Sequence, residues 1–144
     1  MQRKAYSLVE VMFVVILLAI LAAIAIPRLG VNFTVKMKVK TAAQTLVSDL
    51  RYTRRLAVTN NENHKLSINS IANEYSIYDS LDSQVGETKS IDSSIVLSGD
   101  KNFIFESLGN ASVLSDTSVS LSVDGNQADI TMIVATGRIN VSGP

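Results

Sequence analysis

The sequence predicts an α+β fold, in which one long N-terminal helix with an apolar first half packs through its second half on a small antiparallel β-sheet head. Three patterns favour this fold. Residues 11–26 carry no polar group, residues 31–59 repeat apolar side chains at three- and four-residue steps, and residues 64–144 contain several short alternating runs. The chain of 144 residues has no cysteine, so the head must be held by packing alone.

The apolar run follows a short basic start at Arg3 and Lys4. Its sixteen residues span roughly 24 Å as a helix, and the two apolar residues before Glu10 bring it close to the ~20 that cross a bilayer core. One interpretation is a cleaved secretory signal with a weak cleavage site at residues 22–25. Another is a single-span membrane anchor, which leaves the carboxylate of Glu10 unexplained.

Glu10 places a charge beside the apolar run, where it is costly unless it is neutralised or paired. Ser7 and Glu10 have the spacing of a capping box, in which both side chains satisfy free backbone donors at a helix start. This local role does not exclude a functional charge, because one residue can do both.

Residues 31–59 predict an amphipathic helix that buries one stripe and keeps most of its charged residues, Asp49 among them, off that stripe. The stripe consists of Val35, Val39, Ala42, Ala43, Leu46, Leu50, Thr53 and Ala57. Pro27 lacks a backbone N–H, and because the pattern resumes after it we expect a kink or a locally melted turn. The whole helix would run roughly over residues 7–59, about 80 Å, which is too long to be buried in one small domain.

The remaining residues predict a small β head. Alternating runs occur at 65–68, 74–78, more loosely 90–97, 102–105, 118–123, 128–134 and 138–141. Asp124 and Gly125 separate two of these runs and predict a hairpin turn. A head of this size is marginal alone and needs the amphipathic helix to cover one face.

The N-terminus, Arg3-Lys4-Ala5 followed by Tyr6-Ser7-Leu8-Val9-Glu10-Val11, resembles the class III leader of type IV pilins and type II secretion pseudopilins. The resemblance implies that a prepilin peptidase cuts between Ala5 and Tyr6 and methylates the new amino terminus. Glu10 matches the family's glutamate for assembly, and Pro27 matches its helix-kinking proline. Ala5 departs from the family, in which glycine is usual, and this puts the efficiency of processing in doubt.

The resemblance also implies a domain plan and a location. The plan comprises a leader at residues 1–5, a membrane or filament-core helix half at 6–30, an amphipathic helix half at 31–60 and an exported head at 61–144. The location is the bacterial inner membrane, single-pass with a cytoplasmic N-terminus and a periplasmic head, and then a periplasmic pseudopilus or surface pilus. The implied partners are the prepilin peptidase, the inner membrane before assembly and other pilin subunits through helix–helix packing.

Within this family the chain is most similar to the GspH/FimT group of minor pseudopilins and minor pilins. Residues 46–57, 103–109 and 133–141 carry this looser resemblance, while the absence of tryptophan and cysteine argues against the patterns of major subunits. The implied function is that of a structural minor subunit. The alternatives are a major filament subunit and a DNA-binding minor pilin for DNA uptake.

Charge is distributed unevenly along the chain. Residues 1–65 carry ten of the thirteen Lys and Arg and three of the thirteen Asp and Glu, a balance of +7, and residues 66–144 carry the remainder, a balance of −7. The basic helix face can meet acidic loops of its own head or of neighbouring subunits, or it can bind nucleic acid. The candidate residues for a DNA or subunit contact are Arg51, Arg54, Arg55 and Arg138.

The sequence offers little for catalysis. His64 is the only histidine and follows an Asn-rich turn, so we expect a solvated side chain rather than a catalytic base. No Cys/His cluster suggests zinc, and the acids scattered over residues 74–92 are expected to be solvated rather than to bind calcium. We therefore predict no enzyme activity, no cofactor and no metal site.

Overall fold

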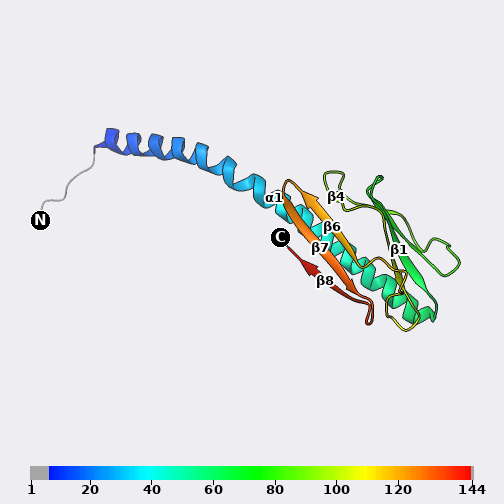
Figure 1. Ribbon diagram of the computed structural model, residues 1–144. Helices are drawn as coiled ribbons and strands as arrows, with labels where there is room; N and C mark the ends of the chain where they lie inside the picture. The colour runs from blue at the N-terminus through cyan, green and yellow to red at the C-terminus, as the bar shows by residue number, and fades with distance from the viewer. Residues whose placement is uncertain (1–6, 144) are drawn as a thin grey trace, which may run out of the picture. The chain divides into compact units, whose positions relative to one another are not determined.

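The computed structural model describes residues 7–143, and for residues 24–32 it describes the backbone alone. Helix α1 (Leu8–Asn60) is followed in the described chain by eight strands (Figure 1). The chain divides into two compact units, one ending at Thr34 and the other beginning at Val35. The long helix predicted for residues 7–59 is therefore confirmed to within one residue at each end.

The head consists of two four-stranded antiparallel sheets. The first has the order β3-β2-β1-β5, built from β1 (His64–Asn69), β2 (Glu74–Tyr78), β3 (Lys89–Ser90) and β5 (Lys101–Phe105). The second has the order β4-β6-β7-β8, built from β4 (Val96–Leu97), β6 (Ser118–Val123), β7 (Asn126–Ile133) and β8 (Arg138–Ser142). Residues 90–97, expected as one loose strand, are instead two short strands in different sheets.

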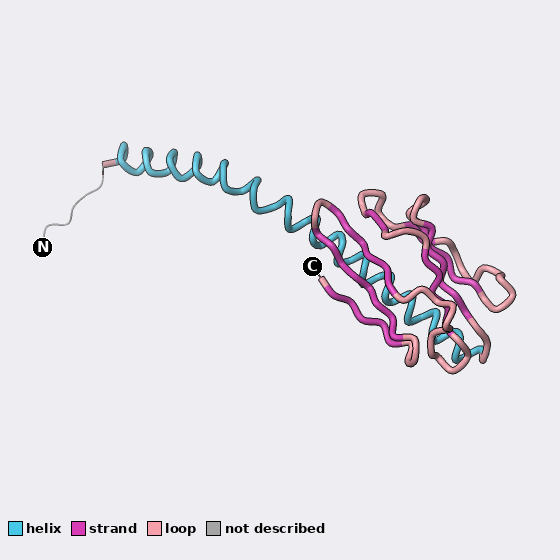
Figure 2. The backbone as a smooth tube through the Cα atoms, viewed as in Figure 1, coloured by secondary structure: helices cyan, strands magenta, loops and turns pink. Residues whose placement is uncertain are grey.

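The second half of α1 and both sheets share one hydrophobic core, and the helix lies along the two sheets in Figure 2. The buried residues of the described helix are Val39, Ala43, Leu46, Val47, Asp49, Leu50, Thr53 and Ala57. The largest fully buried apolar side chains of the head are Phe103, Phe105, Leu66, Ile68, Ile95, Leu121 and Ile130. The predicted stripe is confirmed, with Val35 and Ala42 partly buried at its margin.

The hairpin between β6 and β7 forms at the predicted turn. Asp124 and Gly125 have φ angles of 47° and 80°. Two successive residues with positive φ make a type I′ turn, whose twist matches that of the flanking strands. The Asp-Gly pair therefore sets the register in which Val123 faces Asn126.

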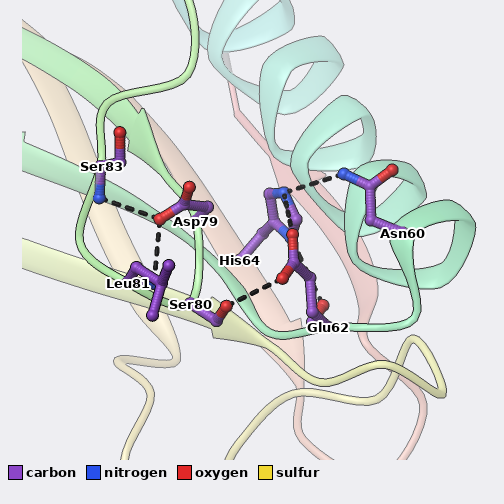
Figure 3. Close-up of polar contacts among 7 residues, drawn as sticks. All are labelled: Asn60, Glu62, His64, Asp79, Ser80, Leu81 and Ser83. Carbon is purple, nitrogen blue, oxygen red and sulfur yellow. Dashed lines mark hydrogen bonds and ion pairs between the residues drawn. The ribbon is translucent and has the colours of Figure 1, made fainter.

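His64 corrects a prediction, because its side chain is 1% exposed and not solvated. It begins β1, and the two-residue period of the strand places it on the same buried face as Leu66 and Ile68. Its ring nitrogens lie 3.3 Å from the carbonyl oxygen of Glu62 and 3.4 Å from the amide nitrogen of Asn60 (Figure 3). The ring therefore packs at the junction between the end of α1 and the start of β1.

Candidate functional site

Ser7 occupies the position that precedes the first turn of α1, and the side-chain bonds of a capping box stay a prediction. The helix begins at Leu8, and the carbonyl oxygen of Ser7 accepts hydrogen bonds from the N–H groups of Glu10 and Val11 at 3.0 and 3.2 Å. Ser7 thus stands where an N-cap stands, and Glu10 lies in the first turn, where a negative charge is favoured by the helix dipole. Its side chain is exposed and can be reached by a partner.

The apolar side chains that follow Glu10 are exposed on all sides of the helix. Every large hydrophobic residue from Leu8 to Leu21 is at least 45% exposed. Consecutive residues point in all directions around a helix of 3.6 residues per turn, so no single face accounts for this surface. An apolar surface of this extent marks an interaction site.

The membrane assignment itself is a separate question. Among the described residues, no helix combines the length and the apolar character needed to cross a membrane. The predicted segment at residues 6–30 extends beyond the side chains that are described, and its placement in a membrane stays a prediction.

The predicted processing site and the side chain of Pro27 lie outside the part of the chain that the structure describes. Ala5 and Tyr6 lie outside the described residues. The helix is continuous through residue 27, so no melted turn interrupts it there. The side chain of Pro27 lies outside the description, and the kink stays a prediction.

The side chain of Arg54 makes a hydrogen bond within the head. Its Nε donates to the carbonyl oxygen of Gly109 at 2.7 Å and ties the loop after β5 to the helix. A Cβ atom at Gly137 would collide with the same carbonyl oxygen, so the turn before β8 packs directly against this loop. Arg54 therefore has a structural contact within the head, and its part in a DNA or subunit contact stays a prediction.

The other three candidate arginines are exposed. Arg51 and Arg138 line one shallow groove of about 500 Å³ together with Arg54, so the structure brings these three together. Arg55 lines an adjoining hollow of about 260 Å³ with Arg51, Arg54, Val58 and Thr59, and its guanidinium carbon lies 5.7 Å from the centroid of the Tyr52 ring. Within residues 7–143, no carboxylate lies within 4.0 Å of any of the four guanidinium groups.

Asp49 is a structural site that the sequence pattern missed. It was expected off the buried stripe, yet it is only 8% exposed. Its carboxylate accepts a hydrogen bond of 2.6 Å from the Tyr75 hydroxyl and pairs with Lys89 at 2.8 Å. Burial, and then the hydrogen bond to Asp49, raise the pKa of Tyr75 well above its ordinary value. Asp49 lies one helical turn before Thr53, a residue of the predicted stripe, and this spacing could have predicted that Asp49 is buried.

The acids of residues 74–92 mainly hold their own loops. Asp79 accepts hydrogen bonds from the N–H groups of Leu81 and Ser83 at 2.9 Å each (Figure 3). Asp92 accepts bonds from the Ser94 side chain and backbone and pairs with Lys38, and these contacts lower the pKa of Asp92 to about 2. Among the described residues, no group of three His, Asp or Glu side chains is arranged to hold a metal ion.

The N-terminus matches the family model of the prokaryotic N-terminal methylation motif over residues 1–26. The chain carries a prepilin-type methylation motif. No curated protein sequence matches the chain. The prepilin-type motif covers the apolar start of α1, Glu10 included, and stops just before Pro27.

Two of the solved structures similar to this chain show its fold. The minor pseudopilin EpsH from the Type 2 Secretion System of Vibrio cholerae is 12% identical, with a TM-score of 0.59 over 74% of this chain and 98% of that one. The type IV minor pilin FimU of Pseudomonas aeruginosa is 17% identical, with a TM-score of 0.62 over 78% of this chain and 96% of that one. At these identities the likeness shows the fold alone, and the expected type IV pilin-like fold is confirmed.

Proposed function

We propose that this chain is a structural minor subunit of a type IV pilus or a type II secretion pseudopilus. A prepilin peptidase would remove residues 1–5, and the mature chain would begin at Tyr6. The subunit would wait in the inner membrane with its head in the periplasm, and then enter a filament through its N-terminal helix.

The observation that carries this proposal is the exposed apolar half of α1 with Glu10 at its start. The apolar side chains require cover that the described part of the chain does not supply, and either a bilayer or a bundle of similar helices supplies it. In the bundle, Glu10 would pair with the amine of Tyr6 of a neighbouring subunit. Such a pair offsets the desolvation of both groups, so a lone Glu10 favours leaving the membrane for the filament.

Substitution of Glu10 tests this mechanism. Glu10→Gln and Glu10→Ala should still insert into the membrane fraction but should be lost from sheared or purified filaments, because the neutral side chain cannot pair with the amine. Glu74→Gln, which neutralises an exposed acid of the head, is the matched control and should assemble normally. Incorporation of both Glu10 variants at the level of the natural chain would rule out the assembly role.

The minor role has its own test. We base it on the fold, since the similar structures are those of minor subunits. Quantitative mass spectrometry of purified filaments should find this chain far below the most abundant pilin. A chain that makes up most of the filament mass would instead be the major subunit.

A further inference from the structure

The outer edge of β5 is covered by the chain that follows it. Along the outer edge of β5, the N–H groups of Asn102 and Ile104 donate to Asp116 Oδ2 at 2.7 Å and Ser115 Oγ at 2.9 Å. The carbonyl oxygens of Asn102 and Ile104 accept from the N–H groups of Asp116 and Ser112 at 2.8 and 2.9 Å. This edge therefore has no free pairing groups for another chain.

The edge of β8 is different. It is the outermost strand of its sheet (Figure 1) and is five residues long, whereas the edge strands β3 and β4 have two residues each. Within the described residues, its backbone makes a single hydrogen bond outside the sheet, from the Arg138 N–H to Thr136 Oγ1 at 3.3 Å. The remaining outward groups of β8 are free to pair with an added strand.

A groove runs between this edge and α1. One part, of about 420 Å³, is lined on the helix by Lys40, Ala43, Gln44, Val47, Ser48 and Arg51. A second part, of about 500 Å³, is lined by Arg51, Arg54 and residues 137–141. The two parts share Arg51 and Val141, so they are continuous.

The dimensions of the groove fit an extended peptide. On the helix side, the distance from Lys40 to Arg54 is about 21 Å at 1.5 Å per residue. On the strand side, Gly137 to Gly143 covers about 20 Å at 3.3 Å per residue. Six or so residues of an added strand would therefore fill the groove from end to end.

The groove is strongly cationic. Lys40, Arg51, Arg54 and Arg138 all line it, and among the described residues none has a carboxylate within 4.0 Å. Beneath the cations, Ala43 and Val47 are buried, with exposed fractions of 1% and 4%, whereas Val141 is 42% exposed. The groove therefore offers a partner mainly cationic side chains and the free main-chain groups of β8.

We propose that the groove binds an extended acidic segment of another subunit, which adds to β8 as a fifth strand. Main-chain hydrogen bonds to β8 supply affinity, and the four cations select acidic side chains. This proposal deepens the proposed function, on which it rests for the nature of the partner. A nucleic acid would use the cations but would leave the free strand edge of β8 without a role.

The test uses the full chain in detergent and three synthetic peptides. The first is acetyl-Thr-Glu-Val-Glu-Val-Glu-Thr-amide. The second has the same sequence with N-methyl groups on alternate residues, which keep the charge but prevent strand pairing, and the third replaces each glutamate by glutamine. Fluorescence anisotropy measures affinity, and amide hydrogen exchange measures protection of residues 139–142.

We expect the first peptide to bind and to protect the β8 amides, and the other two to bind at least about tenfold more weakly. The double variant Arg51→Glu/Arg138→Glu should weaken binding of the first peptide by at least about tenfold. Lys38→Glu, on the same helix but lining no part of the groove or of the hollow beside it, should change it less than about twofold. No binding of the first peptide, equal binding of the N-methylated one, or binding only of a short DNA duplex would each overturn the proposal.

The outcome is separable from that of the proposed function. If Glu10→Gln is lost from filaments while the acidic peptide does not bind, the groove proposal alone fails. If Glu10→Gln assembles normally, the filament mechanism fails whatever the peptides do.

Discussion

At the scale of single residues, the most constrained polar group of the head is the buried carboxylate of Asp49. It joins α1 to two strands through Tyr75 and Lys89. The Lys89 side chain is about half exposed and can be solvated without its partner, whereas the Tyr75 hydroxyl is held in a buried hydrogen bond. The tyrosine therefore contributes more to stability than the lysine.

We expect Tyr75→Phe to lower the free energy of unfolding by about 1–3 kcal/mol, because it leaves a buried acceptor without its donor. Tyr52→Phe, at an exposed position, is the matched control and should change it by less than about 0.5 kcal/mol. Urea unfolding of the full chain in detergent measures both. Equal effects of the two substitutions would contradict the role given to the Asp49 contact.

The same contact predicts a dependence on alkaline pH. The pKa of Tyr75 is raised in the folded chain, so its contribution is complete below the ordinary value of 10.0 and is lost as pH rises above it. The natural chain should lose stability above pH 10 more steeply than Tyr75→Phe. If the free energies of unfolding of the two proteins fell in parallel above pH 10, the pKa of Tyr75 would be the same in the folded and the unfolded state.

Gly137 cannot be replaced by a residue with a Cβ atom without a clash against the backbone. Its φ is 61°, and a Cβ atom would collide with the backbone oxygen of Gly109. Gly125 also has positive φ but has no atom within 4 Å of a built Cβ, which makes Gly125→Ala the control. We expect about 1–2 kcal/mol of destabilisation for the control and a larger loss for Gly137→Ala, measured by thermal unfolding. A loss at Gly137 no greater than that at Gly125 would show that the two loops separate easily.

At the scale of elements, one ion pair ties α1 to the segment between β3 and β4. Lys38 Nζ lies 3.2 Å from Asp92 Oδ2, and the pKa of Asp92 is lowered to about 2, chiefly by its bonds with Ser94. Because the pKa of Asp92 is lower in the folded chain, its charged carboxylate stabilises the fold at pH values above the ordinary pKa of 3.8. This contribution is lost as pH falls through about 2. The protection of residues 91–97 against amide hydrogen exchange, relative to the intrinsic exchange rate at each pH, should therefore fall as pH is lowered between these two values.

Two variants isolate this effect. Asp92→Asn removes the titrating group, so the protection of residues 91–97, relative to the intrinsic exchange rate, should no longer depend on pH in this range. Asp100→Asn removes an acid that bonds to Ser70 instead and should leave that dependence in place. The opposite pattern would assign the acid sensitivity to another loop.

Some elements could be predicted from the sequence because local patterns determine them. The helix stripe follows the 3.6-residue period, and the Asp-Gly pair specifies its own hairpin. The division of residues 90–97 between two sheets depends on long-range pairing with β2 and β6, which no local pattern encodes. Asp49 was placed wrongly for the same reason, since Tyr75 and Lys89 become its neighbours only after folding. His64 was placed wrongly because the alternating run was taken to begin at residue 65, whereas β1 begins at His64 itself.

At the scale of the whole molecule, only some of the charged side chains form ion pairs with one another within the head. Lys38 pairs with Asp92 and Lys89 with Asp49, while the cations along the β8 groove have no carboxylate partner in the described chain. The sequence pattern identified these arginines as a contact surface, but the groove that collects three of them requires the packing of β8 beside α1. The N-terminal motif was predictable in full, because it lies in one continuous stretch.

The central claim is that this chain is a processed filament subunit, and the mature N-terminus tests it most directly. The chain should be produced with its prepilin peptidase, extracted from membranes and measured by intact-mass and N-terminal peptide mass spectrometry. We predict a chain that begins at Tyr6 and carries one methyl group on its amino nitrogen. A chain that begins at Met1, or one cleaved after Ala25, would contradict the account.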